Sequence, residues 1–227
     1  MKRQADSGPL FADRIDAGRV LAERLGAYRG KDALVLGIPR GGVPVAAEVA
    51  RRLEADLDVV VARKLGAPEQ PELAIGAVTA NGGQFLNEEI VRGLGVTDAY
   101  LECVKEEQMA EARRREARFR GGRPTEPVQD RVVILVDDGL ATGATMRAAV
   151  RSVRKHRPAL LVVAVPVGSR EACAALREEA DEFVCPSVPE PFGAVGYFYR
   201  DFQPTEDVEV QNLLREFARR GAVAGAR

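Results

Sequence analysis

The chain has 227 residues, of which 46% are hydrophobic, and its formal net charge is −1. This length fits one large domain, or one domain with a small appendage, and the apolar content is ample for a buried core. Because the charge is balanced, no global field favours nucleic acid or an anionic membrane, and we expect neither as a partner. The longest apolar run, Leu160 to Val167, is far too short to span a bilayer.

The cysteines and the N-terminal residues indicate the cellular compartment in which we expect the protein. Cys103, Cys173 and Cys185 are odd in number and widely spaced, and they form no CxxC pair. This pattern argues against a disulfide framework or a zinc site. Residues 1–14 lack the apolar segment of a secretion signal. We therefore expect a cytoplasmic protein.

The spacing of apolar residues predicts helices and strands that alternate along most of the chain. Residues 1–10 are expected to be disordered. Helices are expected over residues 11–28, 43–53, 98–120, 146–156, 169–180 and 205–220, and strands over residues 33–38, 58–64, 132–136, 159–165 and 182–185. Ser169 is suited to cap the helix that it begins. The alternation favours an α/β fold with a parallel sheet.

Residues 65–87 have a different pattern. Proline and glycine are frequent at the start of this segment, and two short apolar runs then flank the turn Asn81-Gly82-Gly83. Asn-Gly between apolar runs is a strong hairpin signal. The sequence therefore predicts a mobile hairpin arm from Leu65 to Asn87.

The most informative stretch is Val132–Thr145, in which a buried strand leads into two acids, a glycine loop and a helix. The glycines permit a tight turn, and the N-terminus of the next helix favours an anion. Asp137 and Asp138 would repel phosphate, but their oxygens suit ribose hydroxyls or a divalent cation. The pattern indicates a ribose 5-phosphate site. The alternative is a strand end whose acids only cap the helix.

The sequence VILVDDGLATGAT, residues 133–145, resembles the phosphoribosyl-pyrophosphate (PRPP) motif of type I phosphoribosyltransferases. The resemblance implies that the loop binds the 5′-phosphate of PRPP through Gly139, Leu140, Ala141, Thr142, Gly143, Ala144 and Thr145. It assigns a catalytic role to Asp137 and Asp138, which would hold the ribose hydroxyls directly or through Mg²⁺. It also implies a parallel sheet flanked by helices, with a small hood subdomain and a flexible hairpin arm.

The implied organisation is a single domain over residues 1–227. Its core would cover about residues 30–185, the hood about residues 186–204 together with the N-terminal segment, and a C-terminal helix about residues 205–220. The proline- and aromatic-rich segment around Phe192 resembles the hood of hypoxanthine-guanine phosphoribosyltransferases. By that resemblance Phe192 would stack on the acceptor base. Asp201 would lie near the pyrophosphate and would be a ligand of the metal together with Asp137 and Asp138.

The turn Ile38–Gly42 reads IPRGG and ends another strand. Its glycines expose N–H groups, and Arg40 supplies a permanent charge for an oxyanion. Beside the PRPP-like motif it resembles the pyrophosphate loop of the family, with Arg40, Gly41 and Gly42 as ligands and a cis peptide near Arg40. An ordinary turn is the alternative.

Two basic residues and one acid complete the expected site. Arg63 and Lys64 resemble basic residues that reach pyrophosphate in orotate and adenine phosphoribosyltransferases, and the resemblance makes them candidate catalytic residues beside the two acids. A solvated strand end would give the same sequence pattern. The arm occupies the place of the family's flexible loop, which closes over the site and excludes water. Glu72 is the acid on the arm that could touch substrate, or it could be surface charge.

The sequence departs from the 6-oxopurine enzymes at two points. Ala141 stands where those enzymes have an acid, and the strand over residues 159–165 has no lysine to read a 6-oxo group. The motif is nearer to that of adenine phosphoribosyltransferases, and the sequence does not identify the acceptor base.

The leading hypothesis is a Mg²⁺-dependent transfer of ribose 5-phosphate from PRPP to a nitrogenous base or related small-molecule nitrogen acceptor. A regulator that binds PRPP or a nucleotide without turnover is the alternative. A phosphatase would need Asp-x-Asp spacing, which the motif lacks. The arginines of residues 113–123 share their helix with glutamates, so we interpret this helix as a salt-bridged surface facing solvent or a second subunit of a homodimer.

Overall fold

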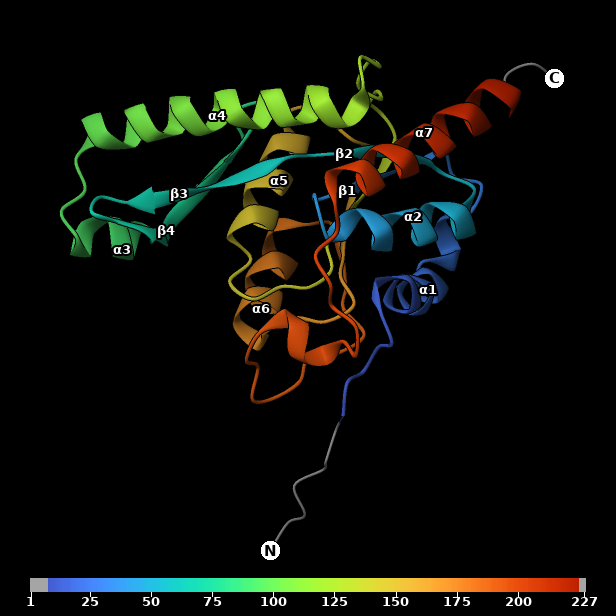
Figure 1. Cartoon of the computed structure of the whole chain (residues 1–227), viewed down its shortest axis with the longest axis horizontal. Coiled ribbons are helices and arrows are strands. Elements are labelled where there is room, and N and C mark those ends of the chain that lie inside the picture. Colours follow the sequence, from blue (N-terminus) through green and yellow to red (C-terminus); the bar gives the residue numbers. More distant parts are fainter. Residues whose placement is uncertain (1–7, 225–227) are drawn as a thin grey trace, which may run out of the picture.

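The computed structural model describes residues 8–224, so the expected disorder of residues 1–10 falls largely outside the described part of the chain. A five-stranded sheet forms its centre, and all of the paired strands run parallel (Figure 1). The strand order is β2 (Asp56–Val59), β1 (Ala33–Gly37), β6 (Val132–Val136), β7 (Leu160–Ala164) and β8 (Glu182–Val184). The middle strands are apolar throughout because both faces of the sheet are covered. The predicted α/β class is confirmed.

Helices cover both faces of this sheet (Figure 1). One face carries α1 (Arg14–Arg24), α2 (Gly42–Leu53), α7 (Asp207–Ala224) and the C-terminal part of α4 (Asp98–Arg120). The other face carries α5 (Ala144–Arg154) and α6 (Arg170–Glu179). Ser169 caps α6 as predicted, since its hydroxyl oxygen accepts from the N–H of Ala172 at 3.1 Å. None of the helices between residues 8 and 224 has the length and apolar character that a bilayer crossing requires.

A second, antiparallel sheet extends away from the core beneath α4 (Figure 1). It consists of β3 (Ala62–Ala67), β4 (Gln70–Thr79) and β5 (Gln84–Leu86). The turn around Asn81 is closed by a hydrogen bond from the N–H of Thr79 to the carbonyl of Gly83, so the predicted hairpin is confirmed. A short helix, α3 (Glu88–Gly93), follows and was not predicted. It begins where the Asn87 side chain accepts from the N–H of Ile90.

The predicted strand over residues 58–64 is wrong, because two strands of different sheets share this stretch. β2 ends at Val59, and β3 begins at Ala62. Between them the N–H of Val61 donates to Glu116 Oε1 of α4 at 3.0 Å, so a side chain replaces the next strand as its partner. The apolar run VVVA continues through this junction, and the sequence pattern alone therefore hides it.

Glu116 belongs to a buried ion cluster that fixes this junction. Arg120 pairs with Asp58 at 2.9 Å and with Glu116 at 2.9 Å, and its Nη2 donates to the carbonyl of Val59 at 2.9 Å. These three charged side chains are no more than 10% exposed. Burial opposes the charge of Arg120, but the two acids outweigh it and raise the pKa of the guanidinium. The cluster therefore anchors the start of the hairpin to both β2 and α4.

Candidate active site

The carboxyl ends of β1, β6 and β7 lie in register, so the loops that follow these strands meet at one edge of the sheet. The loop after β6 leads into α5 through Gly143, whose φ of +74° favours glycine. The N–H of Leu140 donates to the carbonyl of Val167, and the Ser169 hydroxyl donates to the carbonyl of Ala141 at 2.7 Å. The predicted phosphate loop is thus anchored at the N-terminus of a helix, where backbone N–H groups favour an anion.

Asp137 and Asp138 follow β6 directly and begin this loop. Arg14 of α1 donates from Nε to Oδ2 of Asp138 at 2.8 Å, and the Tyr199 hydroxyl donates to the Asp138 carbonyl at 2.6 Å. Burial raises the pKa of both carboxyl groups. The charge of Asp138 raises the pKa of Asp137 further, whereas Arg14 opposes the rise at Asp138. The two acids are therefore a tightly spaced pair whose charge an arginine partly balances.

The predicted pyrophosphate loop packs directly against these acids. A Cβ atom on Gly41 would lie 2.0 Å from Asp138 Oδ2, and one on Gly42 would lie 2.8 Å from the Cα of Asp137. No side chain fits at either position unless the acids move. The peptide between Pro39 and the following residue is cis, as the resemblance implies. Two motifs far apart in the sequence thus form one continuous surface.

We expect Gly42→Ala to destabilise the protein by about 1–3 kcal/mol, because the added methyl group would overlap backbone atoms. Gly26→Ala is the matched control, since no atom lies within 4 Å of its added Cβ. Urea denaturation of the two variants measures the difference. Equal stabilities would show that the two loops can separate at little cost.

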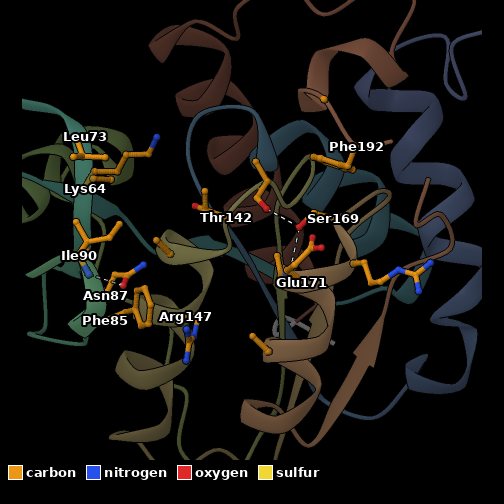
Figure 2. A pocket seen from close by; sticks show the side chains of 18 of the residues that line it. Lys64, Leu73, Phe85, Asn87, Ile90, Thr142, Arg147, Ser169, Glu171 and Phe192 are labelled. Carbon is orange, nitrogen blue, oxygen red and sulfur yellow. Dashed lines mark hydrogen bonds between the residues drawn. The ribbon is translucent and has the colours of Figure 1, made fainter. Parts of the chain in front are cut away.

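The basic residues expected at the site do not all converge. The Arg40 side chain is 40% exposed and extends toward α7, with Nη1 3.6 Å from Oδ1 of Asp207. Arg63 and Lys64 are neighbours on β3, so their side chains leave opposite faces of the strand. Arg63 donates from Nε to Gln108 of α4 at 3.1 Å, whereas Lys64 lines the cleft that the hairpin forms with the core (Figure 2).

This cleft has a volume of about 1270 Å³ and lies between the hairpin, the phosphate loop and the hood (Figure 2). The hairpin side contributes Lys64, Glu72, Leu73, Phe85 and Asn87, and the core and hood contribute Thr142, Arg147, Ser169, Glu171, Glu190 and Phe192. Glu72 is exposed and lines the cleft, and its contact with a substrate stays a prediction. The guanidinium of Arg147 lies 3.9 Å from the centroid of the Phe85 ring, which holds the hairpin against the first turns of α5.

The hood contains residues from both ends of the chain. Backbone hydrogen bonds join residues 10–12 to residues 198–201, and Phe11 forms a bridge with Tyr199. Phe192 is half-buried against Phe198, with ring centroids 5.2 Å apart, and also borders the cleft. One aromatic side chain of the hood therefore forms part of the cleft wall.

The chemistry of the acid pair fits Mg²⁺, which is commonly bound by one or two carboxylates together with substrate phosphates. Asp137 and Asp138 supply such carboxylates beside the glycine loop. The expected third ligand, Asp201, is exposed, and its carboxylate accepts from the N–H of Gln203. Within residues 8–224 no group of three or more His, Cys, Asp or Glu side chains is placed to hold a metal. The predicted three-carboxylate set is therefore not assembled among the described residues.

Three residues of the site were absent from the sequence-based expectations. Arg14 reaches the acid pair, Arg147 lines the cleft beside the phosphate loop, and Tyr199 binds the motif backbone. Arg147 could have been found, because it lies in the first turn of the helix that follows the motif. Arg14 and Tyr199 carry no local signal, since only the folded chain brings them to β6.

A parallel sheet with paired acids and two glycine loops at one edge is typical of an α/β domain that binds a sugar phosphate. The sequence model described as phosphoribosyl transferase domain matches residues 10–202, and the chain belongs to this family.

Similar proteins agree with this family. The chain is 49% identical over 221 residues to proteins from two strains of Mycobacterium tuberculosis that carry the name "putative phosphoribosyl transferase". The match covers 96% of this chain but only 50% of those relatives, so the chain spans about half of their length. The crystal structure of TT1426 from Thermus thermophilus is 47% identical, with a TM-score of 0.78, and covers 91% of this chain and 98% of that one.

Proposed function

We propose that the protein transfers ribose 5-phosphate from PRPP to a nitrogen acceptor and releases pyrophosphate. One observation supports this most strongly, namely the direct contact of Gly41 and Gly42 with the acids of the PRPP-like motif. The contact brings a candidate pyrophosphate loop beside a candidate ribose site, in the order in which PRPP carries these groups. A site for phosphate alone would not need the second loop.

In the proposed complex, each charged or polar part of PRPP is bound by a different part of the site. The loop over residues 139–145 holds the 5′-phosphate, and Asp137 and Asp138 accept hydrogen bonds from the ribose hydroxyls. The loop around Arg40 and the Lys64 ammonium face the pyrophosphate. Bound Mg²⁺ would supply positive charge that stabilises the departing pyrophosphate. As C1 of the ribose becomes cationic, the enzyme acts mainly by positioning and by charge stabilisation.

The acceptor enters the cleft between the hairpin and the hood. The volume of this cleft, about 1270 Å³, is ample beside the roughly 300–1,000 Å³ of typical ligand sites. Its wall includes Ala141, Thr142 and Ala144, so an acceptor in the cleft would lie beside the loop that holds the 5′-phosphate. Phe192 stacks on the acceptor from the hood side, and Glu72 approaches from the hairpin. In this proposal the hairpin excludes water from the reactive carbon when it closes.

Pyrophosphate release tests the proposal. The protein is incubated with PRPP and Mg²⁺ and with a panel of nucleobases, other aromatic nitrogen heterocycles and amines. We expect release with at least one member and none without an acceptor beyond slow hydrolysis. PRPP binding without release across the whole panel would indicate a binding protein that does not turn over. Absence of PRPP binding would overturn the proposal itself.

A further inference from the structure

Arg14 at the first position of α1 is the arginine that contacts the acid pair. Its Nε lies 2.8 Å from Asp138 Oδ2, and the two side chains are only 12% and 15% exposed. Its Nη1 donates to the carbonyl of Gln203 at 2.7 Å, and the guanidinium lies 3.9 Å from the ring centroid of Phe202. Arg14 is therefore held from the hood side in one orientation.

The same guanidinium borders the second loop. Its Nε lies 3.0 Å from the position that a Cβ on Gly41 would take, and that position is also 2.0 Å from Asp138 Oδ2. Arg14, Asp138 and Gly41 thus meet at one point, where the acid pair and the candidate pyrophosphate loop join. The guanidinium of Arg14 thus brings a positive charge to the junction of the acid pair and this loop.

We infer that Arg14 is a positioning residue, which rests on the proposed function and adds to it a residue outside both sequence motifs. Arg14 holds Oδ2 of Asp138 against Gly41 and so directs Oδ1 toward the ribose hydroxyls. Its charge offsets the repulsion between the buried acids and the incoming diphosphate. The contacts of Arg14 with Gln203 and Phe202 of the hood fix the position of its guanidinium. Through Asp138 they also determine how the ribose is bound.

The variant Arg14→Gln keeps a hydrogen-bond donor but removes the charge and shortens the reach. We expect it to weaken binding of ribose 5-phosphate, measured by isothermal titration calorimetry, by about 10- to 100-fold, the range seen when a supporting partner of a ligating group is removed. Arg14→Lys keeps the charge and should recover part of the loss. Arg19→Gln is the matched control, since Arg19 lies on the same helix with a side chain that is 70% exposed.

A double-mutant cycle separates positioning from a general structural role. Asp138→Asn alone, Arg14→Gln alone and the two together are titrated with ribose 5-phosphate and, separately, with pyrophosphate and Mg²⁺. If Arg14 acts through Asp138, the double variant binds ribose 5-phosphate about as weakly as Asp138→Asn alone. Losses that simply multiply would overturn the inference, as would unchanged binding by Arg14→Gln.

Two further measurements keep this inference distinct from the proposed function. Circular dichroism and the melting temperature without ligand show whether Arg14→Gln is folded. If Arg14→Gln is unfolded, Arg14→Lys is titrated in its place with Asp138→Asn as the reference. An affinity for ribose 5-phosphate above that of Asp138→Asn supports the inference, and an affinity no higher than that of Asp138→Asn overturns it. If the wild-type protein binds neither ribose 5-phosphate nor PRPP, the proposed function fails. If the wild-type protein binds and Arg14→Gln binds equally well, only the role of Arg14 fails.

Discussion

Replacing Asp137 and Asp138 together by asparagine is expected to abolish the stabilisation of the protein by PRPP and Mg²⁺. At a PRPP concentration about 100 times its dissociation constant, the wild-type protein should gain about 2.7 kcal/mol. For a chain of this size that corresponds to a rise in melting temperature of roughly 5–11 °C. The amides cannot carry the negative charge that attracts Mg²⁺, and they would donate where the ribose hydroxyls need acceptors.

Thermal denaturation with and without ligand measures this effect. Glu23→Gln serves as a control, because Glu23 is an exposed acid on α1. This control should keep the full ligand-induced rise. The double variant itself should melt close to the wild-type temperature without ligand, because relief of the repulsion between the two neighbouring acids is offset by the loss of the ion pair between Asp138 and Arg14. A normal ligand-induced rise in the double variant would show that PRPP binds elsewhere.

Arg120→Ala is expected to lower the free energy of unfolding by about 3–5 kcal/mol, since it leaves Asp58 and Glu116 buried without their shared cation. For a domain of this size the melting temperature should fall by roughly 6–20 °C. The effect extends beyond stability, because Glu116 also accepts from the N–H of Val61 at the start of the hairpin. Urea denaturation followed by circular dichroism measures the loss.

Arg114→Ala on the same helix is the matched control for this variant. Arg114 is 71% exposed and pairs with Glu111 at 2.7 Å on the surface. An exposed pair of this kind contributes about 0–1 kcal/mol, so this variant should remain close to the wild type. Similar losses from Arg114→Ala and Arg120→Ala would mean that the buried cluster does not hold the junction between β2 and β3.

The sequence alone determined the elements with strong local patterns. The strands β1, β6 and β7 could be predicted from their apolar runs, because a strand that is buried on both faces is apolar at nearly every position. The glycine loop before α5 and the hairpin turn around Asn81 were also evident, since each depends on backbone conformations that few residues adopt. The family followed from these local features, because the residues that carry them are adjacent in the chain.

Tertiary structure alone decided where one sheet ends and the other begins. β2 and β3 share one apolar run, and the break between them depends on the buried cluster around Arg120, whose members come from separate segments. It likewise decided that Lys64 faces the cleft while Arg63 faces α4. The contacts of Arg14 and of Gly41 with Asp138 join segments that local patterns cannot relate. Such contacts arise from packing between distant segments, and only the folded chain specifies them.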